Sequence, residues 1–221
     1  MAASNPPESV ISEINKGTVH PVYLLYGAEV YFIDRITSLL KERVVKPESA
    51  DFDCEILDGD STSLNAVLGQ ALSPSWFGGR RMVVVKRAPW FKSGSEDEQQ
   101  ALERYFSRPM ESTVLVLQAG TEVDKRKKAF KAASKSARVV ECEELKDRER
   151  REWLNRRARD FGLRLDAAAL SHLILFGGRS LYGLESELEK LSCYASGAAA
   201  DVDLAMVKAV RAAGDTKGTV L

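Results

Sequence analysis

Cysteine, histidine and long apolar runs are all scarce in this sequence of 221 residues. The three cysteines, Cys54, Cys142 and Cys193, lie far apart and form no CxxC pair. That spacing argues against a disulfide framework and a zinc knuckle, and it favours a reducing, cytoplasmic setting. No apolar run is long enough to cross a bilayer, so we expect no membrane-spanning segment. The first residues also lack the basic-then-apolar layout of a secretion signal.

An excess of charge of either sign is missing as well. The chain has 32 basic and 32 acidic residues, so bulk attraction to a polyanion is excluded and any nucleic-acid contact must come from a local patch. Hydrophobic residues make up 44% of the chain and charged residues 29%. This is ordinary globular composition, which excludes a fibrous protein and disorder over the whole length.

Strands and helices alternate about five times between residues 21 and 141. Apolar or alternating runs predict strands, and positions recurring at three and four predict the helices between them. The expected strands are 21–27, 52–57, 81–86, 113–117 and 137–141, and the expected helices are 31–45, 64–72, 96–106 and 124–134. Buried strands separated by helices require crossover connections, so the sequence predicts an α/β fold with a parallel sheet covered by helices.

Beyond Cys142 the pattern becomes helical. Helices are expected over 146–160, from Asp166 to the Gly177-Gly178 break, from Ser180 onward, and after Asp201 or Asp203. The sequence therefore predicts an α/β domain over residues 1–142, a small all-helical domain over 143–213 and a tail over 214–221.

Motifs for catalysis are also missing. A phosphate-cradling loop needs G-x-x-x-x-G-K-[ST], but the turn after the first strand reads Gly27-Ala28-Glu29-Val30-Tyr31-Phe32. The later strands end in Lys86-Arg87-Ala88 and Gln118-Ala119-Gly120 rather than in the acids that would hold magnesium. His20 and His172 have no evident partners, and Asp58 and Asp60 fit a turn better than a metal site. We predict no catalytic residue, no bound cofactor and no metal.

Two adjacent aromatic residues, Trp76 and Phe77, stand between a proline and two glycines just before an apolar strand. In one interpretation, one ring packs inward while the other covers an edge of the domain. In the other, the pair is an exposed apolar plug that enters a partner's pocket, since aromatic anchors dominate binding hot spots.

A basic run, Lys125, Arg126, Lys127 and Lys128, lies in the expected helix 124–134. Charge runs usually form a solvated helix face, and the sequence favours that interpretation. The alternative is a contact with a nucleic-acid backbone or with an acidic partner.

Taken in order, several segments resemble the delta subunit of bacterial DNA polymerase III, the family of clamp-loader subunits. The resemblance extends from about residue 20 to residue 212 and is specific as an ordered set rather than in any one segment. Its segments are Pro21-Val22-Tyr23-Leu24-Leu25-Tyr26-Gly27-Ala28-Glu29, Trp76-Phe77-Gly78-Gly79-Arg80-Arg81-Met82-Val83-Val84-Val85-Lys86, Thr113-Val114-Leu115-Val116-Leu117 with Asp124-Lys125-Arg126-Lys127-Lys128, and Gly177-Gly178 with Leu184-Glu185-Ser186-Glu187-Leu188-Glu189-Lys190-Leu191.

The resemblance implies an AAA+-type sheet domain with a degenerate nucleotide site, followed by a helical lid. It implies a non-catalytic subunit that binds and opens the β sliding clamp during DNA replication, with Trp76 and Phe77 as an apolar wedge and Leu72 as a supporting contact. Tyr182 stands where many AAA+ ATPases have a phosphate-sensing arginine. The family's third, helical collar domain is expected to be missing from this sequence.

The same resemblance implies partners: the β sliding clamp, the gamma/tau ATPase subunits, delta prime and primer-template DNA. It places the chain in the cytoplasm, at the nucleoid-associated replisome, as part of a DNA-directed DNA polymerase. The alternative hypothesis is a degenerate AAA+ module that binds nucleic acid through the basic run at Lys125–Lys128 and contacts no clamp.

Overall fold

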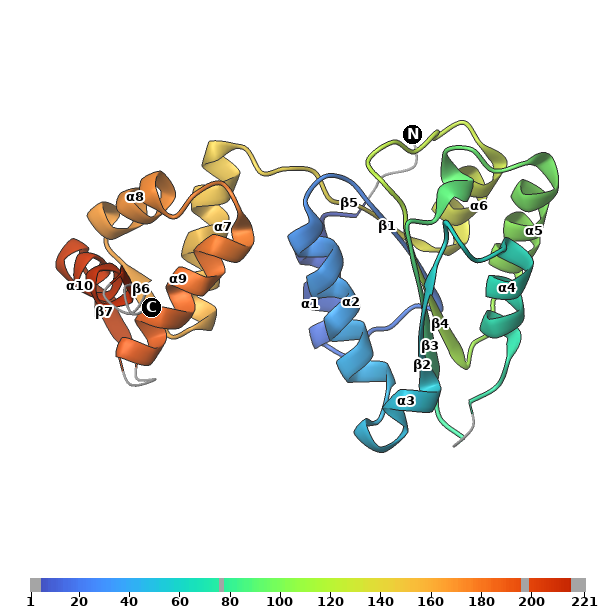
Figure 1. Cartoon of the computed structure of the whole chain (residues 1–221), viewed down its shortest axis with the longest axis horizontal. Coiled ribbons are helices and arrows are strands. Elements are labelled where there is room, and N and C mark those ends of the chain that lie inside the picture. The colour runs from blue at the N-terminus through green and yellow to red at the C-terminus, as the bar shows by residue number, and fades with distance from the viewer. Residues whose placement is uncertain (1–4, 76–77, 196–198, 216–221) are drawn as a thin grey trace, which may run out of the picture. The chain divides into compact units, whose positions relative to one another are not determined.

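A computed structural model describes residues 5–75, 78–195 and 199–215 of the chain. It divides into two compact units, residues 1–144 and 145–221 (Figure 1). The assignment of these units as a clamp-binding domain and a lid remains a prediction. The fold class expected from the sequence is confirmed, because a parallel sheet covered by helices is followed by a helical unit.

The first unit is built on a five-stranded parallel sheet. Its strands are β1 (Val22–Tyr26), β2 (Cys54–Asp58), β3 (Arg81–Lys86), β4 (Thr113–Gln118) and β5 (Arg138–Glu141). They lie in the order β2-β3-β4-β1-β5. The central strands are buried on both faces, which explains why they are continuous apolar runs rather than alternating ones.

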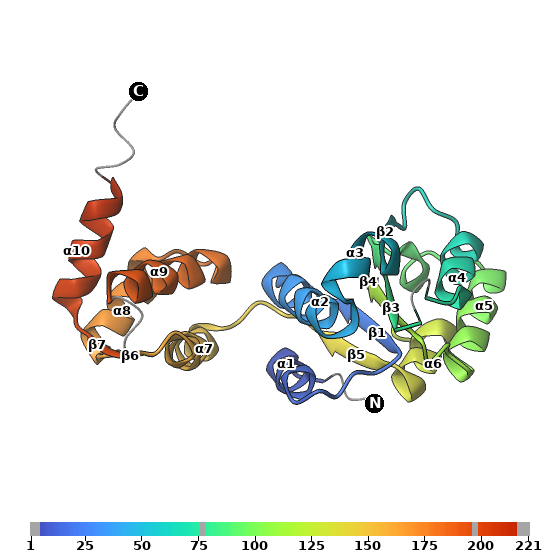
Figure 2. The ribbon, with the colours of Figure 1, turned by 90° about the horizontal axis from the view of Figure 1, so that it is seen from below.

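Helices cover both faces of this sheet. Figure 1 and Figure 2 show α1 (Pro7–Asn15), α2 (Val30–Val44) and α3 (Ala50–Asp53) on one side, and α4 (Leu64–Leu72), α5 (Glu96–Ser107) and α6 (Lys128–Ser136) on the other. Two short 3-10 turns, Pro47–Ser49 and Pro89–Phe91, complete the connections.

A buried glutamine joins three elements on the α5 side of the sheet. The side chain of Gln99 donates to the carbonyl of Trp90 over 2.6 Å and accepts from the backbone N–H of Ala129 over 3.0 Å. Both ends of the amide are therefore satisfied inside the core, which fixes α6 against α5.

Two details of the first unit differ from the sequence expectations. The cap of α4 is Ser63, whose hydroxyl accepts from the backbone N–H of Ala66, rather than Ser61 or Thr62. The basic helix expected over 124–134 begins only at Lys128, because the Asp124 carboxylate accepts from the backbone N–H of Arg126 and holds residues 124–127 in a turn.

The outer edge of β5 is covered by the start of the chain. Asn5 forms a parallel bridge with Val140, and both its backbone N–H and its side-chain amide donate to the carbonyl of Val139. The outer edge of β2, at the opposite side of the sheet, has no paired strand among the described residues.

The second unit contains α7 (Asp147–Asp160), α8 (Ala167–Phe176), α9 (Leu181–Tyr194) and α10 (Leu204–Asp215). The sequence predicted an all-helical domain here, but β6 (Leu163–Leu165) and β7 (Ala200–Val202) form a small parallel sheet within it. Asp166 caps α8 as expected, and the side chain of Asp203, rather than that of Asp201, accepts from the first turn of α10. Within the described ranges, no helix is long and apolar enough to cross a membrane.

Candidate functional site

The connection between α4 and β3, residues 73–80, is called the α4–β3 loop below. It begins directly after Leu72, the last residue of α4, which is 54% exposed. Exposed leucines at helix ends are common, but this one lies four residues before an adjacent pair of aromatic residues that stands in the sequence between a proline and two glycines. Trp76 and Phe77 themselves lie outside the described residues.

Local hydrogen bonds explain why α4 ends where it does. The backbone N–H of Ser73 donates to Gln70, its hydroxyl donates to the carbonyl of Gly69 over 2.9 Å, and its backbone is extended. Pro74 follows, and the residue before a proline is biased away from helical geometry. The exposed Leu72 is therefore held on the last turn of a capped helix.

A hydrogen bond also joins the two sides of the α4–β3 loop. The backbone N–H of Gly79 donates to the hydroxyl of Ser75 over 3.2 Å. Gly78 has a φ of +70°, a left-handed conformation that glycine adopts without strain. The loop thus leaves α4 and returns to β3 through a constriction formed by Ser75 and Gly79.

The turn after β1 is packed against the segment that follows β5. The backbone N–H of Cys142 donates to Tyr26, and its carbonyl accepts from Glu29 over 2.8 Å. Gly27 has a φ of +129°, and a Cβ atom at this position would lie 2.2 Å from the Cys142 carbonyl oxygen. The backbone of Cys142 therefore fills the space beside this turn.

The side-chain carboxylate of Glu29 caps the amino terminus of α2. Glu29 accepts from the backbone N–H of Tyr31 over 3.4 Å. Burial raises the pKa of the Glu29 carboxyl, the hydrogen bond from Tyr31 opposes that change, and Glu144 adds to it. An acidic side chain thus occupies the helix end at which phosphate groups bind in nucleotide-binding proteins.

Each member of the basic run contacts a group in its own domain. Lys125 pairs with Glu141 over 2.7 Å, Arg126 pairs with Asp124 over 3.0 Å, Lys127 donates to the carbonyl of Gly94, and Lys128 pairs with Glu96. The pairing with Arg126 lowers the pKa of the Asp124 carboxyl to about 2. Such exposed pairs are weak, so they reduce the positive field of the run without making its side chains unavailable.

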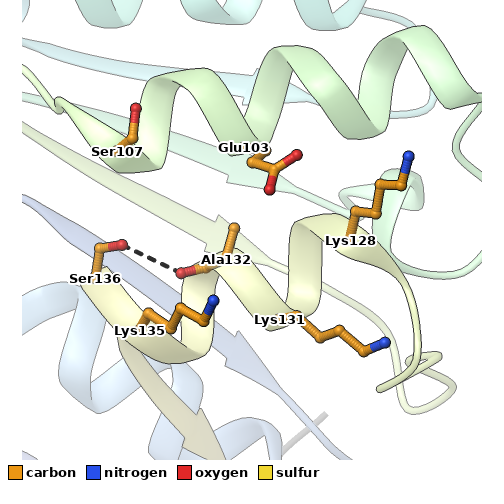
Figure 3. A pocket seen from close by; sticks show the side chains of 7 residues that line it. All are labelled: Glu103, Ser107, Lys128, Lys131, Ala132, Lys135 and Ser136. Atoms are coloured by element: carbon orange, nitrogen blue, oxygen red, sulfur yellow. Dashed lines mark hydrogen bonds between the residues drawn. The ribbon is translucent and has the colours of Figure 1, made fainter.

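A pocket of about 260 Å³ lies between α5 and α6, next to this run (Figure 3). Lys128, Lys131 and Lys135 line it from α6, and Glu103 and Ser107 line it from α5. In the part of the chain that the structure describes, no carboxylate pairs with Lys131 or Lys135. The free positive charge on α6 therefore lies one to two turns beyond the run that the sequence analysis singled out.

The histidines have structural contacts. His172 packs against Phe176, with 4.4 Å between the ring centroids and a tilt of 45° between the rings, and His20 lies 3.9 Å from a carboxylate oxygen of Glu13. Burial lowers the pKa of His20, Arg138 lowers it further, and Glu13 opposes both. Across residues 5–75, 78–195 and 199–215, no three His, Cys, Asp or Glu side chains gather in a group that could hold a metal ion.

Comparison with known proteins gives the chain its family. A family model described as "DNA polymerase III, delta subunit" matches residues 23–143. The chain belongs to the DNA polymerase III delta subunit family. Over 192 residues it is 33% identical to DNA polymerase III subunit delta of Bacillus subtilis (strain 168), with 84% of this chain and 55% of that protein covered. The resemblance found from sequence motifs is thereby confirmed.

A solved structure of the same family agrees. The DNA clamp loader delta protein of Bacillus subtilis is 30% identical to this delta-family chain and superposes with a TM-score of 0.81. The match covers 91% of this chain and 61% of that protein. The chain thus spans somewhat more than half the length of the relatives that it matches.

No local sequence pattern indicates the contacts that hold the α4–β3 loop of this delta-family chain. Gln70, Ser75 and Arg81 were included only as members of an expected helix, loop and strand. Their partners lie in other elements or across the loop, so no local pattern could have indicated them. A signal was nevertheless present in Arg81, a charged residue at the start of a strand otherwise expected to be buried.

Proposed function

We propose that this chain is a non-catalytic clamp-loader subunit that binds the β sliding clamp through the end of α4 and the α4–β3 loop. Leu72, Trp76 and Phe77 form the apolar contact in this proposal. The observation that carries it is the exposed Leu72 on a capped helix end, followed directly by a loop with two aromatic residues and a constriction at Ser75 and Gly79, within a delta-family domain.

In this proposal the chain opens the clamp by binding the open ring more tightly than the closed ring, and no covalent chemistry is needed. A ligand shifts a conformational equilibrium only by its difference in affinity for the two states. In this proposal the apolar contact fits the opened ring better than the closed ring, so that binding energy favours opening. The gamma/tau ATPase subunits and delta prime would supply the nucleotide-driven steps, with primer-template DNA as the substrate of the whole assembly in the cytoplasmic, nucleoid-associated replisome.

Two features support a role without nucleotide hydrolysis. The backbone of Cys142 fills the space beside the turn after β1, and the Glu29 carboxylate caps α2 where a phosphate group would need the free N–H groups. We therefore expect clamp binding by this chain to be the same with and without ATP.

The test is a binding titration against the sliding clamp from the same source. Trp76→Ala combined with Phe77→Ala should weaken binding about a thousandfold or more, because losing two buried aromatic anchors costs several kcal/mol. Leu72→Ala should weaken it less. Leu175→Ala is the matched control, since Leu175 is a 73% exposed leucine of the second unit. Full affinity in the double variant would refute the assignment of the contact.

Opening is measured separately, with a pair of fluorophores placed across the clamp interface. The wild-type chain should raise the fraction of open rings, whereas the double variant should not, even at concentrations that restore occupancy. Binding without any change in the open fraction would reduce the proposed function to clamp binding alone.

The alternative, a nucleic-acid-binding module that uses Lys125 to Lys128, gains no support from the geometry. All four side chains already contact groups of the same domain, and the unpaired lysines of α6 lie elsewhere.

A further inference from the structure

A single buried guanidinium connects the two ends of the α4–β3 loop. Arg81 is the first residue of β3 and therefore the residue at which the loop ends. Its Nη2 donates to the Glu55 carboxylate of β2 over 2.9 Å and to the side-chain oxygen of Gln70 over 3.5 Å. Gln70 lies in the last turn of α4, two residues before Leu72.

The side chain of Arg81 is only 4% exposed, and its Nε has no hydrogen-bond partner among the described residues. Desolvating a charge with an unsatisfied donor is costly, and apolar residues of similar volume often replace buried ion pairs without loss of stability. Stabilisation alone therefore accounts poorly for an arginine here. A role in fixing geometry accounts for it better, because the guanidinium extends from β3 to the Glu55 carboxylate of β2 and to the Gln70 side chain of α4.

Two further hydrogen bonds fix the end of the α4–β3 loop, where the chain enters β3. The backbone N–H of Arg81 donates to Ser112 over 2.9 Å, and Nε of Arg80 donates to the carbonyl of Glu111 over 3.3 Å. The end of the loop is thereby held to the segment before β4. At the start of the loop, the contact of Gln70 with Arg81 adds to the hydrogen bonds that Ser73 makes with the last turn of α4.

We propose that Arg81 is a positioning residue, which fixes both ends of the α4–β3 loop and so pre-organises the surface around Leu72 for a protein partner. It acts through Gln70 at the start of the loop and through its own backbone at the end. A loop held in its bound shape avoids the ordering cost at association. This inference rests on the proposed function for the identity of the partner, but not for the anchoring itself.

The experiment compares Gln70→Ala with Gln70→Glu. Alanine removes the contact while leaving the buried ion pair between Arg81 and Glu55 intact, and it suits a helix, so the fold should persist. Glutamate keeps an acceptor oxygen for the guanidinium and should restore the link. In titrations against the sliding clamp, we expect Gln70→Ala to bind about three- to tenfold more weakly and Gln70→Glu to bind within twofold of the wild type. Arg104→Met, a change at an exposed arginine of α5, is the control for unrelated surface effects.

A second measurement requires no clamp. Chymotrypsin cleaves after aromatic residues, so the rate of native-state cleavage at Trp76 or Phe77 reports how freely the loop opens. Gln70→Ala should raise this rate severalfold at an unchanged melting temperature, and Gln70→Glu should not.

The outcomes separate the two proposals. Wild-type affinity together with wild-type cleavage in Gln70→Ala would overturn the positioning role of Arg81. Equal weakening by both Gln70 variants would also overturn it, since Gln70 would then act by direct contact. Absence of clamp binding by the wild type, with faster cleavage in Gln70→Ala, would refute the proposed function and leave the anchoring of the loop established.

Discussion

Replacing Gly27 with alanine tests how firmly the turn after β1 is closed. The added Cβ would lie 2.2 Å from the carbonyl oxygen of Cys142, where ordinary contacts begin at 3.4 Å. The two segments must therefore separate, and the hydrogen bonds that Cys142 makes with Tyr26 and Glu29 must lengthen. Alanine would also have to adopt a φ near +129°, a region that is nearly exclusive to glycine.

These costs can be added. Backbone strain contributes about 1–3 kcal/mol, and weakening two backbone hydrogen bonds contributes about 0.5–1.5 kcal/mol each, for a total of about 2–6 kcal/mol. For a domain of this size, 1 kcal/mol lowers the melting temperature by roughly 2–4 °C, so the first unit should melt roughly 10 °C lower.

The assay is thermal unfolding followed by calorimetry, with Gly120→Ala as the matched control. Gly120 follows the neighbouring strand β4, and a Cβ at this position would meet nothing within 4 Å. We expect Gly120→Ala to melt within a few degrees of the wild type. If Gly27→Ala also melted near the wild type, the Cys142 backbone would not close this turn, and the argument against a bound phosphate would lose its main support.

Three further predictions follow from charge and burial. Burial raises the pKa of the Cys142 thiol to about 12, so at pH 8 a thiol reagent should label the exposed Cys193 rapidly and Cys142 only after unfolding, as mass spectrometry of the labelled protein would show. Burial also raises the pKa of Glu29, so the stability that this group contributes is greatest when it is protonated and is lost as pH rises through the native pKa. The Glu29→Gln variant should therefore melt at a higher temperature than the wild type at pH 7 and at the same temperature in acid. The opposite order of melting temperatures would contradict burial as the cause. Lys131→Glu combined with Lys135→Glu should leave clamp affinity within twofold of the wild type, and a large loss would place the binding surface on α6.

The sheet could be predicted from sequence because its central strands are buried on both faces. The runs over residues 22–26, 82–85 and 114–117 are apolar without interruption, which is the pattern of a parallel sheet covered by helices. The predicted start of α6 was wrong because a polar turn at Asp124 competes locally with the helix.

The small sheet of the second unit could not have been predicted in the same way. Leu163–Leu165 and Ala200–Val202 are only three residues long and pair across more than thirty residues of chain. Neither segment is long enough to show a period of two, and their pairing depends on the packing of the helices between them.

The candidate site was predicted only in part. Leu72 is exposed at the end of α4, and the roles of Leu72, Trp76 and Phe77 in binding remain predictions. The four basic residues were recognisable from sequence, but the carboxylates and carbonyls that engage them are contributed by distant segments such as those around Gly94 and Glu141.

The bridge between Asn5 and Val140 has a practical consequence for how the chain is prepared. A recombinant version trimmed to begin at Pro7 would leave the β5 flank bare, and prolines cannot replace the lost amide donor. Within the described residues, β2 also has no strand paired to its outer edge, so each molecule would then have two unpaired sheet edges, which promote association between molecules. Retaining the opening residues is therefore the simplest safeguard against self-association in concentrated samples.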